Sequence, residues 1–157
     1  MPKTLAVIAP QVGALSETFI RRHMESLLPK KTVVVANTNS KPYAGHWDIE
    51  CPQLILNQIH QKRTLLQRAY QKVADQFAQE KDRTLLSAKK FMQRHQVDVM
   101  LCEYLDLSVR WLPLAQSLGI PFYAHAHGYD VSFRLQDEEW REKYRQLGQA
   151  KQRGLLL

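Results

Sequence analysis

The sequence predicts a single α/β domain of the Rossmann-like kind, with a parallel sheet and helices on both of its faces. Short, nearly continuous apolar runs recur at residues 4–10, 31–37 and 97–104, and such runs are typical of parallel strands that are covered on both sides. Segments with helical periodicity separate these runs. Strands that alternate with helices at this spacing form βαβ units with right-handed crossovers.

Length, charge and cysteine content set the outer limits. The 157 residues, 45% of them hydrophobic, suffice for one core and are too few for two ordinary domains. We expect residues 1–150 to form the domain and residues 151–157 a short atypical tail. The net charge of +7 implies an acidic partner, such as a nucleotide, nucleic acid or an anionic membrane surface. Two distant cysteines, the absence of an apolar leader and the absence of an apolar stretch of roughly 20 residues favour the cytoplasm.

The first strand is followed by a glycine-containing loop and a helix. Residues 11–15 form the loop around Gly13, Ser16 is expected to cap the helix, and Pro29 ends it. A strand, a loop with glycine and a helix N-terminus together offer backbone N–H groups to a phosphate or a carboxylate. An ordinary turn without a ligand is the alternative.

The middle of the chain is basic. Residues 31–37 form the second strand, residues 38–52 read as a loop, and residues 55–96 have helical periodicity with a new helix after Asp82. Between residues 57 and 96, nine Lys or Arg stand against three Asp or Glu, a local net charge of 9 − 3 = +6. One interpretation is an amphipathic surface that docks on anionic lipid headgroups; the other is a solvated helix face.

The second half of the chain repeats the pattern. Residues 97–104 form the third strand, residues 107–118 a helix, and residues 119–121 the turn into a fourth strand. A last helix is expected at about residues 137–147.

The fourth strand, which starts at Pro121, carries polar side chains to its carboxyl end. Its residues alternate between two faces, with His125 and His127 on one of them, and the pattern breaks at Gly128. Glycine can adopt backbone conformations closed to other residues and lets a ligand approach the main chain. Because ligands of open α/β sheets bind outside the carboxyl ends of the strands, His127, Gly128 and Asp130 are expected at a site, with His127 placed for chemistry.

Two motifs carry a family resemblance. The sequence SETFI at residues 16–20 follows the first strand, and HGYDVS at residues 127–132 follows a later one. Together they resemble the N-terminal domain of the family-4 glycosyltransferases, and within that family enzymes of exopolysaccharide and colanic-acid assembly. The similarity in order and spacing covers residues 5–147. It implies one half of a GT-B fold, in a metal-independent enzyme that transfers a hexose from a nucleotide sugar with retention of configuration.

The resemblance also implies roles for individual residues. The candidate catalytic residues are His127, which would face the transferred sugar, and Asp130; Gly13 and Gly128 would lie at the cleft near the donor phosphates, and Ser16 and Glu17 would line the acceptor side. The acceptor would be a glycan or a lipid-linked sugar. The nucleotide sugar is a substrate, and no cofactor or metal is implied.

The chain departs from the family pattern after Leu147, where another strand, a linker and a C-terminal donor domain would follow. We therefore expect a truncated chain, or a separate polypeptide that supplies the donor half. Without that half the chain alone is expected to be inactive, because half of the contacts to the transition state are missing. A cytoplasmic enzyme with peripheral contact to the inner face of the membrane fits this expectation.

Other functions remain as alternatives. A non-catalytic α/β module could bind an acidic partner or a membrane surface through the basic helices. His125 and His127, with Asp130 or Glu103, could form the metal site of a hydrolase, although no further cluster of ligands supports it. Nucleic-acid binding is not expected, because the aromatic residues among the basic ones fall at core-facing helical positions and form no stacking platform.

Overall fold

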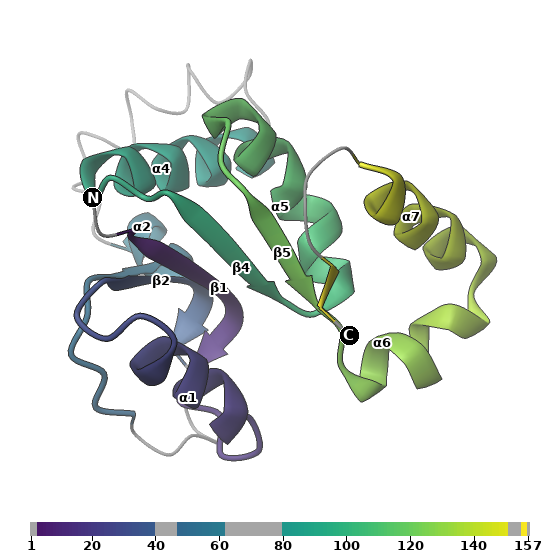
Figure 1. Cartoon of the computed structure of the whole chain (residues 1–157), viewed down its shortest axis with the longest axis horizontal. Helices are drawn as coiled ribbons and strands as arrows, with labels where there is room; N and C mark the ends of the chain where they lie inside the picture. Colours follow the sequence, from purple (N-terminus) through teal and green to yellow (C-terminus); the bar gives the residue numbers. More distant parts are fainter. Residues whose placement is uncertain (1–2, 40–46, 62–79, 151–154, 157) are drawn as a thin grey trace.

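The computed structural model of the chain is an α/β domain built on one parallel sheet of six strands (Figure 1). The structure describes residues 3–39, 47–61, 80–150 and 155–156. The strands are β1 (Leu5–Val12), β2 (Thr32–Asn39), β3 (Gln53–Ile55), β4 (Val99–Glu103), β5 (Phe122–His125) and β6 (Leu155–Leu156). They lie in the order β3-β2-β1-β4-β5-β6, and every neighbouring pair is parallel. The predicted Rossmann-like α/β fold class is confirmed.

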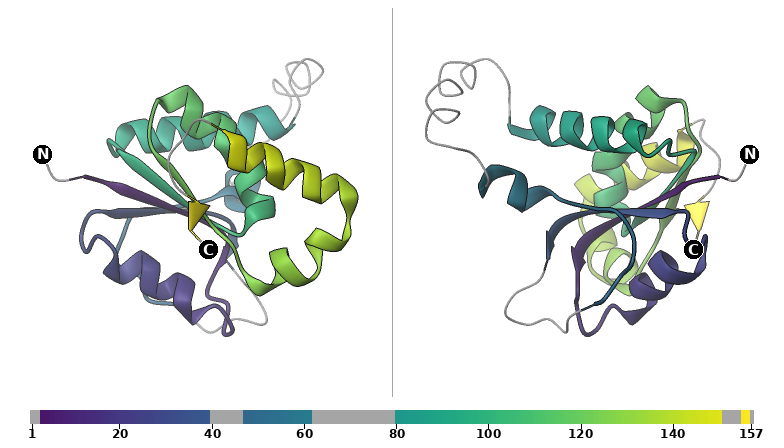
Figure 2. Two further views of the ribbon diagram at one scale, coloured as in Figure 1. Left: turned by 45° about the vertical axis from the view of Figure 1, so that its right-hand side comes forward. Right: turned by 90° about the vertical axis from the view of Figure 1, so that its left-hand side faces the viewer.

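Helices cover both faces of the sheet (Figure 2). One face carries α1 (Thr18–Ser26), whose Ile20 and Met24 pack against Leu5, Val7 and other residues of the sheet. The opposite face carries α2 (Leu56–Gln61), α4 (Glu80–Arg94) and α5 (Leu105–Leu118). Because alternate residues of the central strands point to the two cores, the strands read as unbroken apolar runs.

The chain after β5 forms α6 (Gly128–Ser132), a 3₁₀ turn η1 (Arg134–Gln136) and α7 (Glu138–Gln149). Helix α7 packs against α5, and its Tyr144 and Leu147 contact the core on that face. The predicted last helix is therefore present. The sequence pattern did not predict α6, η1 or β6, although Leu155–Leu156 of the expected tail pair with β5.

Several predicted boundaries were wrong. Helix α1 begins at Thr18 with Glu17 at its N-cap, so Ser16 does not cap it and lies exposed in a turn. Trp47, which was predicted to lie in the loop after β2, is buried in the core on the α1 face. The short strand β3 follows this loop. Three residues are too few to show a strand pattern in the sequence.

The predicted basic surface falls mainly outside the described residues or on side chains that the structure does not describe. Of its members, Lys90 and Arg94 of α4 are exposed and Lys89 is half-buried. Among the described helices, none combines the length and the apolar character that crossing a bilayer requires.

The strand order reverses between β1 and β4, because the chain runs outward from β1 to β2 on one side and from β4 to β5 on the other. Helix α1 leaves the sheet on one face and α5 on the opposite face. In open α/β sheets, ligands bind at such a reversal, outside the carboxyl ends of the strands. The candidate site should therefore lie where β1, β4 and β5 end.

Candidate functional site

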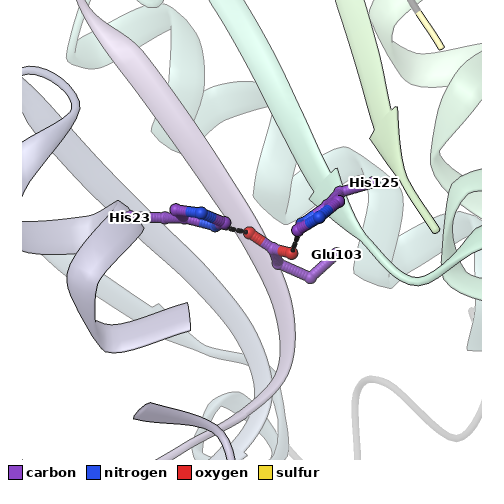
Figure 3. Close-up of side chains that lie close together, drawn as sticks. All are labelled: His23, Glu103 and His125. Atoms are coloured by element: carbon purple, nitrogen blue, oxygen red, sulfur yellow. Dashed lines mark hydrogen bonds and ion pairs between the residues drawn. The ribbon is translucent and has the colours of Figure 1, made fainter. Parts of the chain in front are cut away.

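A fully buried glutamate, Glu103, lies at the carboxyl end of β4. One carboxyl oxygen, Oε1, is 2.6 Å from His23 Nδ1, and the other, Oε2, is 2.8 Å from His125 Nδ1 and 3.0 Å from His127 Nε2. Figure 3 shows His23 and His125 approaching the carboxyl group from two sides. We call Glu103 and these three histidines the histidine cluster.

Three elements of the fold bring the cluster together. Alternation along β4 turns Cys102 toward the α5 core and Glu103 toward the α1 face. Glu103 and His125 are register partners in the pairing of β4 with β5. His23 reaches the same carboxyl group from the middle of α1. Residues distant in sequence thus meet at the carboxyl edge of the sheet.

The cluster favours an ionised Glu103. Burial opposes ionisation, but the hydrogen bonds from His127, His23 and His125 outweigh it, and the pKa of the Glu103 carboxyl lies below its ordinary value. A carboxylate can only accept hydrogen bonds. Each of the three contacting ring nitrogens therefore carries a hydrogen atom and donates a hydrogen bond to the Glu103 carboxylate.

A second buried carboxyl group, that of Asp130, holds the segment next to the cluster. Its Oδ2 accepts hydrogen bonds from the backbone N–H of His127 (2.9 Å) and of Leu105 (3.0 Å), and its Oδ1 accepts one from the Tyr144 hydroxyl (3.1 Å). These bonds join the start of α6 to the first turn of α5 and to α7. The geometry gives Asp130 a positioning role, acting through the backbone of His127.

Tyr104 connects the two motifs that the sequence singled out. Its hydroxyl donates to Glu17 Oε1 (2.7 Å), and its ring centroid lies 4.2 Å from that of His127. The Phe19 ring lies 4.7 Å from the same histidine. Burial and the hydrogen bond to the Glu17 carboxylate raise the pKa of Tyr104. The SETFI and HGYDVS segments therefore form one site.

The backbone of Tyr104 is strained. Its φ of 73° and ψ of 139° fall in a region that side-chain-bearing residues rarely adopt and that is enriched at functional sites. The residue stands between the end of β4 and the start of α5, at the reversal of strand order. This strain is independent support for a site at that position.

Replacing Tyr104 with phenylalanine is expected to lower the free energy of unfolding by about 1–2 kcal/mol, because a hydrogen bond to a charged group is lost. The other oxygen of Glu17, Oε2, already lacks a partner among the described residues. Urea unfolding measures the change. Tyr123→Phe is the control, since the half-buried Tyr123 hydroxyl makes no hydrogen bond within the described chain. Equal effects of the two changes would show that the bond to Glu17 contributes nothing.

The predicted site residues are only partly brought together. His127, Asp130 and Glu17 lie in or next to the cluster, and His127 is 12% exposed against 23% for His23 and 26% for His125. No hydrogen bond or ring contact within the described residues joins Gly13 or Ser16 to the cluster.

The two predicted glycines differ in their backbone. Gly13 has a φ of 99°, in the region that favours glycine, directly after β1. Gly128 has no positive φ, because it starts α6 in a helical conformation. The prediction that Gly128 uses a backbone conformation closed to other residues was therefore wrong. A Cβ atom placed at Gly128 would meet no described atom within 4 Å, apart from its own chain neighbours, so the space next to this residue is open.

Sequence reasoning missed His23 and Tyr104 and considered Glu103 only as an alternative metal ligand. One signal was present: a glutamate at the end of an apolar strand is rarely buried without a partner. His23 gave no signal, since its position on α1 is ordinary for a helix flanking a core.

The cluster also contains a set of metal-binding groups. One ligand atom each from His23, Glu103 and His125 lie within 4.8 Å of one another, and two histidines with a carboxylate are a donor set that Zn²⁺ accepts. Zinc bonds of 2.0–2.1 Å place tetrahedral ligands roughly 3.3 Å apart, whereas the Glu103 contacts to these histidines are 2.6 and 2.8 Å. The side chains are therefore spaced for hydrogen bonds, and a cation would have to spread them and replace their protons. Asp130, the other ligand considered, faces N–H groups instead.

Comparison with known proteins does not identify a family for this chain. No family model matches this chain, and no curated protein matches it.

Proposed function

We propose that this chain is the acceptor-side domain of a retaining, metal-independent glycosyltransferase of the GT-B type. It would transfer a hexose from a nucleotide sugar to a glycan or a lipid-linked acceptor. The observation that supports this most is that the two motifs meet. Phe19 packs on His127, and Glu17 accepts a hydrogen bond from Tyr104, whose ring lies beside His127. Both motifs stand at the carboxyl edge of the sheet, where this function requires them.

The chemistry of the cluster is suited to the reaction. A transition state with a departing diphosphate needs positioned hydrogen-bond donors around the transferred group. The three histidines are held in fixed orientations by one buried carboxylate, and His23 and His125 remain about a quarter exposed. Such side chains supply donors and acceptors to a sugar without reorganising.

The reaction needs a second domain that binds the nucleotide, on the same polypeptide or on another one. In the family that the motifs resemble, that domain grips the nucleotide and the donor sugar, while the domain described here faces the acceptor. The donor is a substrate, so the proposal includes no cofactor.

The enzyme would work in the cytoplasm, where nucleotide sugars are made, and would contact the inner face of the membrane when its acceptor is lipid-linked. The net charge of +7 and the exposed Lys90 and Arg94 on α4 support attraction to anionic headgroups. A protein that binds such a surface without transferring sugar would instead be a non-catalytic module.

The test is a transfer assay with the completed enzyme. The chain is combined with its donor-binding domain and supplied with UDP-glucose, UDP-galactose or GDP-mannose, and release of the nucleoside diphosphate and labelling of a lipid extract are measured. We expect His127→Ala to lower turnover roughly a hundred-fold while the nucleotide-sugar Kd changes little, because the donor domain holds the nucleotide.

His95→Ala is the matched control, since His95 follows α4 and its ring packs on Phe91, away from the cluster. Its turnover should equal that of the wild type. Failure of the wild-type complex to use any nucleotide sugar would contradict the proposed function. An unchanged rate in His127→Ala would remove His127 from the mechanism.

A further inference from the structure

A cavity of about 340 Å³ opens at the carboxyl edge of the sheet, next to the histidine cluster. Pro10 of β1, Asn37 of β2 and Leu107 of α5 form part of its wall. We call it the Asn37 pocket. Its volume is at the lower end of the roughly 300–1,000 Å³ that small-ligand sites occupy, so it suits one or two sugar rings.

The pocket presents hydrogen-bond donors and acceptors together. The Asn37 amide offers both, and among the described residues it has no side-chain partner. Asp106 accepts from Arg134 through Oδ2, which leaves Oδ1 available. The backbone N–H groups of Asp106 and Leu107 lie in the first turn of α5, where the helix provides no hydrogen-bond acceptor for them. The N–H of Leu105, by contrast, already donates a hydrogen bond to Asp130.

Two cations pack on the aromatic side chains of the far wall, Arg134 and also Lys143, whose Nζ lies 4.5 Å from the centroid of Trp140. The Arg134 guanidinium lies 4.5 Å from the centroid of Trp140 and 5.2 Å from that of Tyr129, and its Nη2 is 3.3 Å from Asp106. The Tyr129 and Trp140 rings therefore line the pocket, but their faces are already packed against a cation. A ligand in the pocket would contact chiefly the edges of these rings, the Tyr129 hydroxyl and the Trp140 indole N–H.

The charges of the lining argue against a phosphate. No lysine or arginine is among the described residues that line the pocket, and Asp106 contributes a negative group. Arg134 and Lys143 lie against lining residues, but each is paired with a carboxylate, Arg134 with that of Asp106 and Lys143 with that of Glu139. A nucleoside diphosphate would find no free cation there, whereas a neutral polyhydroxyl compound can use the mixed donors and acceptors.

We propose that the Asn37 pocket binds a neutral sugar residue of the acceptor, an inference that rests on the proposed function. Tyr104 lines this pocket and also contacts the histidine cluster, since its ring is 4.2 Å from that of His127. A sugar bound in the pocket thus lies next to the site proposed for transfer. We infer that the bound sugar belongs to the acceptor because the pocket lies next to His127 and because no lysine or arginine is among its described lining residues.

Two-dimensional amide NMR of the full chain tests the pocket directly. The probes are methyl glycosides of glucose, galactose and mannose, each titrated into the labelled protein. At least one should bind at millimolar concentration and shift the amides of Asp106 and Leu107 and the indole signal of Trp140. Asn37→Ala should weaken that binding about three- to ten-fold, the effect of one lost hydrogen bond.

Asn39→Ala is the matched control, because Asn39 lies two residues further along β2 and is exposed. It should leave the affinity unchanged. If none of the glycosides shifts these signals, or if UDP shifts them and the glycosides do not, the sugar pocket is disproved.

The transfer assay separates this inference from the proposed function. If the completed enzyme transfers sugar and Asn37→Ala does not raise the acceptor KM, the pocket proposal fails while the enzyme function stands. If glycosides bind in the pocket but the completed enzyme transfers nothing, the pocket stands and the glycosyltransferase function fails.

Discussion

Replacing Glu103 with alanine is expected to lower the free energy of unfolding by about 3–5 kcal/mol, the usual effect of removing one partner of a buried charged group. The change deprives His23, His125 and His127 of their shared acceptor. It also leaves an unfilled volume where a fully buried side chain was. Urea unfolding followed by circular dichroism measures the loss.

Two further variants make this result specific. Glu103→Gln keeps the volume but presents an amide N–H to histidines that also donate, so it should cost less than alanine, roughly 1–3 kcal/mol. Glu50→Ala removes an exposed glutamate and should change stability by at most about 0.5 kcal/mol. If Glu103→Ala were as mild as Glu50→Ala, the cluster would contribute nothing to the fold.

Stability should also depend on pH through Glu103. Its pKa in the folded chain lies below the ordinary 4.5, and a depressed pKa gives stability that is fully present above the unfolded-state pKa and is lost as the pH falls through the folded-state pKa. The stability difference between the wild type and Glu103→Gln should therefore shrink below about pH 4.5. Unfolding curves between about pH 5 and pH 3 measure it, and a difference that stays constant would refute the shift.

Local pattern was enough to predict the scaffold of the site. The apolar runs of β1, β2 and β4 are continuous because both faces of the sheet are covered. Alternation in β5 placed His125 on the polar face, and its ring does lie toward α1, 5.2 Å from that of His23. Because the strands are parallel, the candidate site was then predicted at the edge of the sheet where their carboxyl ends lie.

Pattern could not predict which partners meet at that edge. That His23 reaches Glu103 depends on the order of the strands and on the face that α1 covers, neither of which is encoded by spacing along the chain. The sequence pattern indicates a polar loop residue at Asp130, yet this side chain is buried and accepts a hydrogen bond from the backbone N–H of Leu105, in the first turn of α5. Gly128 reads as a conformational glycine, although the helical turn that begins there needs none.

Replacing Asp130 with alanine is the second change expected to have a large effect, about 3–5 kcal/mol of lost stability. The backbone N–H groups of His127 and Leu105 and the Tyr144 hydroxyl would all lose their acceptor inside the protein. Since these bonds tie α6 and α7 to α5, amide hydrogen exchange should speed up most in residues 128–149, while the amides of β1 change less.

The matched control is Asp137→Ala. Asp137 caps α7 and accepts from the Glu139 N–H at 2.8 Å, without touching His127. Its loss should cost only about 1 kcal/mol and should loosen α7 alone. If Asp130→Ala unfolds no more easily than Asp137→Ala, the buried carboxyl group does not hold the site together. A larger loss, with faster exchange at His127, shows that Asp130 positions this histidine through its backbone.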